Sequence, residues 1–173
     1  PDVKLFEISD SRTGVRLARF YMDLYPREGK YKHAAAFTLI QGRLLPDGSY
    51  RKPLSAIVAN FDKPAAQKPS TIPHSDVETL FHEFGHIMHQ TLTRAKYQRM
   101  SGTAVARDFV ESPSQMFENW VWDPSLLDRV SGHYLDRSRK LPKELAAKLL
   151  AAKNADSGLI YLRQNFFAAY DMA

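Results

Sequence analysis

Three histidines and three acidic residues lie close together between Ser75 and Gln90, in the sequence SDVETLFHEFGHIMHQ. His82 and His86 are four residues apart, so on a helix their imidazoles lie on one face, one turn from each other. Two imidazoles in that arrangement can bind a single metal ion, and neutral imidazole nitrogen is a common ligand of zinc. The motif H-E-x-x-H therefore predicts that His82 and His86 are zinc ligands.

Glu83 directly follows His82 and projects about 100° around the helix from it. Its carboxylate is therefore expected beside the metal, near a bound water, rather than on the metal itself. Zinc lowers the pKa of such a water to about 7, and the carboxylate can take its proton as hydroxide attacks a polarised carbonyl. We expect Glu83 to be the general base of a zinc hydrolase.

A catalytic zinc site needs a third protein ligand and keeps its fourth position open. The next helical stretch offers Asp108, Glu111 and Glu118. Glu111 is followed by Ser112 and Pro113, and proline starts or kinks a helix, so the backbone of Glu111 is expected at an irregular point. Spacing alone does not separate Glu111 from Asp108.

Other polar residues around the motif have simpler interpretations. Ser75 and Glu78 have the spacing of a capping box at the start of a helix. We expect His74 to be a loop residue and His89 to have a supporting or surface role. Gly85 costs up to about 1 kcal/mol in a helix interior relative to alanine, which suggests that another element must approach closely there.

The elements that position these residues change character along the chain. Strand patterns in the first third form two hairpins around turn-rich spacers, which implies a small, largely antiparallel sheet; the strands are expected at 3–8, 15–25, 34–42 and 54–61. A loop with three prolines covers residues 62–74. Helical patterns follow, at about 76–94, 105–122, 124–135, 142–155 and 157–173.

This order of a sheet followed by helices predicts an α+β fold. We expect one catalytic-core fragment over residues 1–173, with a β-sheet subregion at 1–62 and a helical zinc-site subregion at 63–173. The chain begins at Pro1 without Met and stops inside a helical pattern. These ends suggest a piece of a longer protein.

Composition narrows the class of protein further. The 173 residues are 44% hydrophobic and 25% charged, as in one globular domain. No apolar run approaches the roughly 20 residues of a membrane span, and a cytoplasmic location fits. The absence of cysteine excludes thiolate metal sites. The net charge of +5 comes from scattered basic residues, so nucleic-acid binding is not favoured.

The sequence HEFGHIMHQ, followed by SGTAVARDFVESPSQMFENW, closely resembles the thimet oligopeptidase and oligopeptidase A family of zinc metallopeptidases, peptidase family M3. The resemblance also covers FYMDLYPREGKYKHAAAF and IVANF upstream, and so most of the chain. It implies that His82, His86 and Glu111 bind one zinc ion and that Glu83 is the base. It further suggests that Asp108 either orients an imidazole or has a structural role, and that Gly102 is a candidate substrate contact.

The family resemblance implies hydrolysis of peptide bonds in short oligopeptides, typically in the cytoplasm. It also implies that the family's N-terminal helical wall is missing here, as is the later segment whose tyrosines and histidine bind substrate. We therefore expect a zinc-binding core with weak or no peptidase activity by itself. If 34–41 or 54–61 is an edge strand beside the zinc, it can pair with an extended peptide. The oligomeric state is not predicted.

Two other functions remain possible from the residues. The chain can be a non-catalytic interaction module with a structural metal, in which His89 or Asp108 closes the site as a fourth protein ligand. Nucleic-acid binding through the positive charge is the third possibility. An open, water-bound coordination position would distinguish catalysis from the structural alternative.

Overall fold

The structure, a computed structural model, describes residues 2–173 and has the predicted α+β fold. The chain divides into two compact units. The first ends at Asp123 and contains the sheet and the H-E-x-x-H helix, and the second extends from Pro124 to Ala173. Because all the predicted site residues belong to the first unit, that unit is described in more detail.

A four-stranded sheet forms the first half of this unit, in the order β1, β2, β6, β3. Its strands are β1 (Val3–Ser9), β2 (Arg16–Asp23), β3 (Ala35–Ile40) and β6 (Leu54–Val58). Both predicted hairpins are confirmed, since β1 pairs with β2 and β3 pairs with β6 in antiparallel fashion. The sheet is mixed, however, because β2 and β6 are parallel.

The parallel pair follows from the path of the chain. After β2 the chain crosses to the far side of the sheet and forms β3, which becomes an edge strand, and β6 then returns between them. Two short strands, β4 (Arg43–Leu44) and β5 (Tyr50–Arg51), extend this second hairpin. Its turn contains Gly48 at a φ of +81°, a conformation that glycine adopts without strain.

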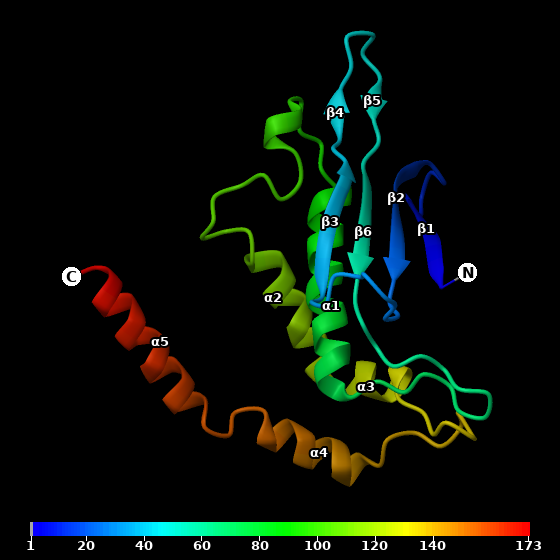
Figure 1. Ribbon diagram of the computed structural model, residues 1–173, viewed down its shortest axis with the longest axis vertical. Helices are drawn as coiled ribbons and strands as arrows, with labels where there is room; N and C mark the ends of the chain where they lie inside the picture. Colours follow the sequence, from blue (N-terminus) through cyan, green and yellow to red (C-terminus); the bar gives the residue numbers. More distant parts are fainter. Residues whose placement is uncertain (1) are drawn as a thin grey trace. The chain divides into compact units, whose positions relative to one another are not determined.

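Helix α1 (His74–Thr91) packs on one face of the sheet (Figure 1). Phe20, Ile57 and Ile87 form the buried core between the two layers, and Phe84 packs against them. The predicted helix at 76–94 is thus present, with its apolar side against the strands. The same packing fixes which side of α1 is left for polar chemistry.

The predicted capping box at the start of α1 is wrong. Pro73 is the N-cap, and no side chain caps the helix. Glu78 instead accepts a hydrogen bond from the indole Nε1 of Trp122 at 2.7 Å. His74 is also not a loop residue, because it starts the helix and its Nε2 lies 3.0 Å from the carbonyl oxygen of Val121. These tertiary contacts fix the N-terminal end of α1.

Helix α2 (Ser112–Glu118) crosses α1 closely and starts much later than predicted. Residues 105–111 form turns rather than helix, because Pro113 is accommodated only in the first turn. Two 3₁₀ turns flank this region, at Gln98–Met100 and Asn119–Trp122. As a result, a long irregular loop joins α1 to α2.

A buried ion pair anchors the connection between β2 and β3. The Nζ of Lys30 lies 2.9 Å from Oδ1 of Asp23 and also donates to the carbonyl oxygens of Asp23, Tyr25 and Ala59. The Lys30 side chain is only 3% exposed. The hydrogen bond from Arg27 and the neighbouring Lys30 lower the pKa of Asp23.

The second unit contains three helices, as the sequence predicts for this part of the chain. They are α3 (Pro124–Val130), α4 (Lys143–Ala152) and α5 (Ser157–Asp171). Among the described residues, no helix is long and apolar enough to cross a membrane.

Candidate metal centre

His82, His86 and Glu111 bring one ligand atom each to a common point. Oε2 of Glu111 lies 3.3 Å from Nε2 of His82 and 3.2 Å from Nε2 of His86. Ligands held at 2.0–2.1 Å from a tetrahedral zinc ion are separated by ~3.3 Å. The two carboxylate–imidazole separations and the chemistry of the three donors therefore fit zinc.

The close crossing of α1 and α2 brings Glu111 to the two histidines. A Cβ on Gly85 would lie 2.6 Å from the Cα of Ser114, so only glycine permits this approach. The expectation that another element comes close at Gly85 is confirmed. Ser114 then donates its hydroxyl to Oε2 of Glu111 at 2.8 Å, which is the main cause of the lowered pKa of Glu111.

A second carboxylate on α2 orients His82. Oε1 of Glu118 lies 2.6 Å from Nδ1 of His82. When Nδ1 donates its proton to this carboxylate, the lone pair of Nε2 is left facing the common point. The sequence offered Glu118 only as a candidate third ligand, and the family resemblance suggested Asp108 for the orienting role. Asp108 is exposed and lies outside the group. The seven-residue spacing of Glu111 and Glu118, about two helical turns, was the signal available.

His86 is the more enclosed of the two histidines. Its side chain is 13% exposed, compared with 25% for His82. Burial lowers the pKa of His86, which keeps the imidazole neutral, the form that binds metals. Its Nδ1 is buried without a hydrogen-bond partner in the described part of the chain.

Glu83 lies on α1 between the two histidines but outside the three-residue group. The residue is 7% exposed, and burial is the main cause of its raised pKa. A backbone hydrogen bond from Ala36 of β3 acts in the opposite direction. Its carboxylate is therefore placed toward the edge strand, close to the metal group and free of it.

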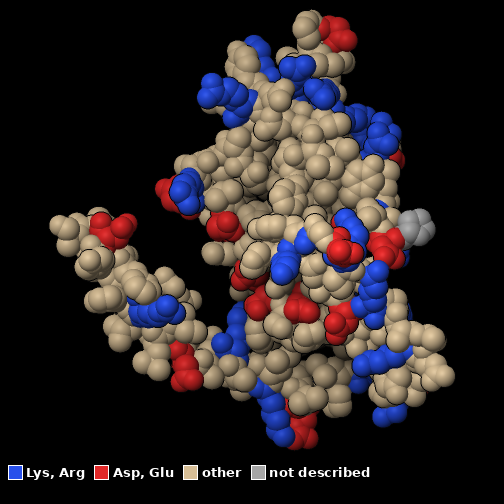
Figure 2. Space-filling view, viewed as in Figure 1, with Lys and Arg blue, Asp and Glu red and all other residues tan. Residues whose placement is uncertain are grey.

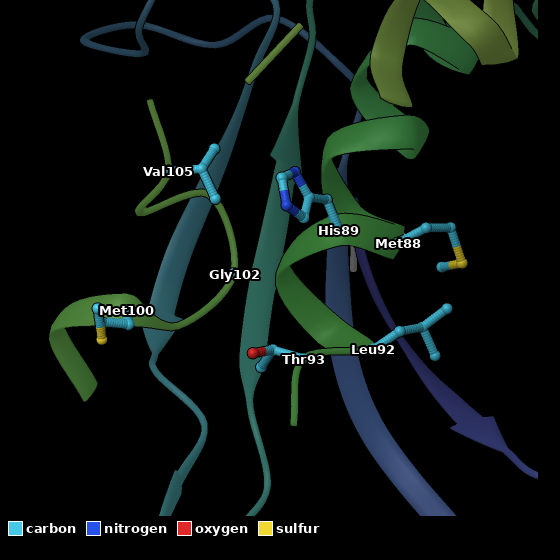
Figure 3. Close-up of a pocket in the computed structure, with 7 residues that line it drawn as sticks. All are labelled: Met88, His89, Leu92, Thr93, Met100, Gly102 and Val105. Atoms are coloured by element: carbon cyan, nitrogen blue, oxygen red, sulfur yellow. The ribbon is translucent and has the colours of Figure 1, made fainter. Parts of the chain in front are cut away.

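His89 and Asp108 do not join this group, so the described residues supply three ligand candidates rather than four. The His89 ring lies 6.0 Å from the ring of Phe109 and lines a separate pocket (Figure 3). Gly102 lines the same pocket. The structure thus places both residues in this pocket and outside the three-residue group.

Known proteins are similar to this chain over most or all of its length. Residues 1–173 match the model of the family described as Peptidase family M3. The chain is 47% identical to a thimet-like oligopeptidase of Dictyostelium discoideum, over 99% of the chain and 26% of that protein. It is 44% identical to oligopeptidase A of Escherichia coli, over 99% of the chain and 25% of that protein. A mitochondrial intermediate peptidase of Arabidopsis thaliana is 41% identical over 90% of the chain and 22% of its own length. The chain thus spans about a quarter of these relatives.

Proposed function

The chain belongs to peptidase family M3, and from this we propose that it is the zinc-binding catalytic core of a metallopeptidase that cleaves short oligopeptides. The observation that carries the proposal is the convergence of two imidazoles and one carboxylate at zinc-like separations, with the Glu83 carboxylate beside them. One zinc ion per chain would be held by His82, His86 and Glu111.

Each residue has a role that follows from its surroundings. His82 and His86 present neutral nitrogens, and Glu118 fixes the orientation of the first. Glu111 adds a negative charge, which the hydroxyl of Ser114 keeps in place. When bound, zinc would supply Lewis-acid polarisation of the scissile carbonyl and a more acidic water.

Glu83 would take a proton from the attacking water and later give one to the departing amine. Its burial supports this role, because burial raises the pKa of Glu83 and so makes its carboxylate a better proton acceptor than an ordinary glutamate. The edge strand β3 contributes the backbone amide that holds this carboxylate. The same edge is available for main-chain pairing with an extended substrate.

A closed structural metal site has less support. Such a site takes four protein ligands, whereas the described residues bring three together. Nucleic-acid binding also has less support, because on the face shown in Figure 2 Lys and Arg gather mainly towards the upper end, whereas Asp and Glu lie across the middle, where the two charges are mixed. A cytoplasmic location stays a prediction, and one relative is named as mitochondrial.

We expect these 173 residues alone to cleave peptides weakly or not at all. The relatives that they match are about four times as long, and the family resemblance places further substrate-binding side chains outside the matched part. Losing one donor that stabilises a developing oxyanion costs on the order of 10²–10³ in rate.

Elemental analysis of the purified, zinc-reconstituted chain tests the ligand set. We expect one zinc per wild-type chain, loss of zinc in Glu111→Ala, and retention in Glu83→Gln. Glu83→Gln should also abolish the peptide cleavage that the wild-type chain shows, without loss of zinc. Asp108→Asn is the matched control, and zinc loss in that variant, or none in Glu111→Ala, would refute the assignment.

A further inference from the structure

A pocket of about 340 Å³ lies at the C-terminal end of α1, where the following loop folds back over the helix (Figure 3). Four of its seven lining residues are large and apolar, and none is a carboxylate, lysine or arginine; they are Met88, His89, Leu92, Thr93, Met100, Gly102 and Val105. This lining is typical of a site for an apolar group with one or two polar contacts.

The pocket continues the metal-binding face of α1. His89 follows His86 by three residues, which places it about 4.5 Å further along the helix axis and on the same side. One residue of an extended peptide covers roughly 3.3 Å. A peptide that is held at the metal centre and runs along α1 would therefore place a side chain one or two residues from the scissile bond at this pocket.

On the basis of the proposed peptidase function, we propose that this pocket binds a bulky apolar side chain of the substrate and that His89 makes it prefer tyrosine. The substrate side chain that binds in this pocket would thus help to determine which peptides the protein selects.

The rim of the pocket consists of apolar side chains that are exposed to solvent. Met100 is 69% exposed, Leu92 47% and Val105 39%. An apolar occupant would remove part of this surface, and its own, from water. Charged occupants would lose hydration without meeting an opposite charge in the lining.

Gly102 allows the loop to approach α1 closely at the side of the pocket. Its φ is +62°, and a Cβ would lie 3.0 Å from the Cα of Gln90. The loop can therefore rest directly on α1, and it adds no side chain at this point. This backbone contact gives the pocket a fixed wall.

His89 supplies the polar group. Its Nδ1 is buried without a partner in the described part of the chain, so Nε2 is the ring nitrogen that an occupant can reach. Burial lowers the pKa of His89, which favours the neutral ring. A neutral imidazole nitrogen either donates or accepts, and a phenolic hydroxyl can do both, so it matches either tautomer.

Titration of blocked peptides, acetyl-Gly-Xaa-Gly-amide with Xaa as Tyr, Phe, Leu, Ala or Asp, tests the proposal by NMR on the zinc-loaded chain. We expect Phe and Leu to bind about tenfold more tightly than Ala, and Tyr about fivefold more tightly than Phe. Asp should bind no better than Ala. The shifts should include the amides of Gly102 and Val105.

Two variants separate the parts of the proposal. Val105→Phe fills the pocket and should reduce the Tyr, Phe and Leu peptides to the affinity of the Ala peptide. Val15→Phe, the same change at an exposed turn, should leave all affinities unchanged. His89→Leu should equalise Tyr and Phe while both remain tighter than Ala. Thermal melts check that each variant folds.

Equal affinity for all five peptides would overturn the proposal, as would a Tyr preference that survives Val105→Phe or His89→Leu. Failure of the proposed function has a different signature, namely no bound zinc by elemental analysis of the same samples. If the chain binds zinc but shows no side-chain preference, only the proposal for this pocket is refuted.

Discussion

Replacing Glu118 with alanine is expected to weaken zinc binding ten- to hundredfold while the fold is retained. Glu118 touches the centre only through Nδ1 of His82, at 2.6 Å. Without it, the imidazole can rotate and can place its proton on either nitrogen. Each zinc-binding event must then select one orientation and one tautomer from several.

The magnitude follows from the exposure of the pair. The side chains of His82 and Glu118 are 25% and 32% exposed, so solvent weakens their interaction only in part. Loss of a carboxylate that supports a metal-bound histidine typically costs 10–100-fold in metal affinity. This corresponds to about 1.4–2.8 kcal/mol. Glu118→Gln keeps an oxygen that can accept a hydrogen bond from Nδ1 of His82, so its loss of zinc affinity should lie near the lower limit of this range.

Competition with a fluorescent zinc chelator would measure the dissociation constants of the wild type and both variants. Glu144→Ala is the matched control, because the Glu144 side chain is 83% exposed and pairs with Lys148 on α4. Its affinity should equal that of the wild type. If Glu118→Ala binds zinc within twofold of the wild type while Glu111→Ala does not bind, His82 does not depend on Glu118 and the reasoning fails.

Two further predictions concern stability. Asp23→Asn should reduce the free energy of unfolding by about 2 kcal/mol at pH 7, less than for a fully broken buried pair because Lys30 keeps three carbonyl acceptors. Since the folded-state pKa of Asp23 is lowered, the stabilisation by its carboxylate is complete above about pH 4 and is lost as the pH falls further. Urea melts of the two proteins should therefore converge in acid, and a constant difference would contradict the ion-pair explanation. Gly85→Ala should cost about 1–3 kcal/mol and weaken zinc binding, because the new Cβ pushes against the backbone of Ser114. Gly158→Ala, in the open helix α5, is its control and should be neutral or stabilising in the same melts.

Local sequence patterns predicted much of this structure because each of these patterns is compatible with one local conformation. The turn-rich spacers gave both hairpins, and the four-residue spacing placed His82 and His86 side by side. Patterns of this kind do not report which strand lies beside which, so the parallel pairing of β2 with β6 was missed. The capping box failed for a related reason, since a tertiary hydrogen bond from Trp122 competes for Glu78.

The carboxylates of the candidate centre are a second case in which local patterns did not determine the tertiary arrangement. Asp108 and Glu111 are three residues apart, and the sequence could not separate them without a known start for α2. Once Pro113 sets that start at Ser112, Glu111 becomes the N-cap residue and Asp108 remains in an exposed turn. The family resemblance reached Glu111 by another route, but it did not identify Glu118.

The crossing of α2 over α1 determines the positions of two carboxylates of the candidate centre, Glu111 and Glu118. Glu111 lies at the start of α2 and Glu118 at its end, and both reach histidines on α1. The position of α2 on α1 therefore sets both the place of the proposed third ligand and the orientation of His82, and Gly85 sets how closely the two helices approach. A shift of α2 would displace both carboxylates at once, whereas Glu83 would stay in place, because α1 and the edge strand hold it. Zinc affinity should consequently respond to changes at the crossing, while the environment of the proposed base should depend on the contact between α1 and β3.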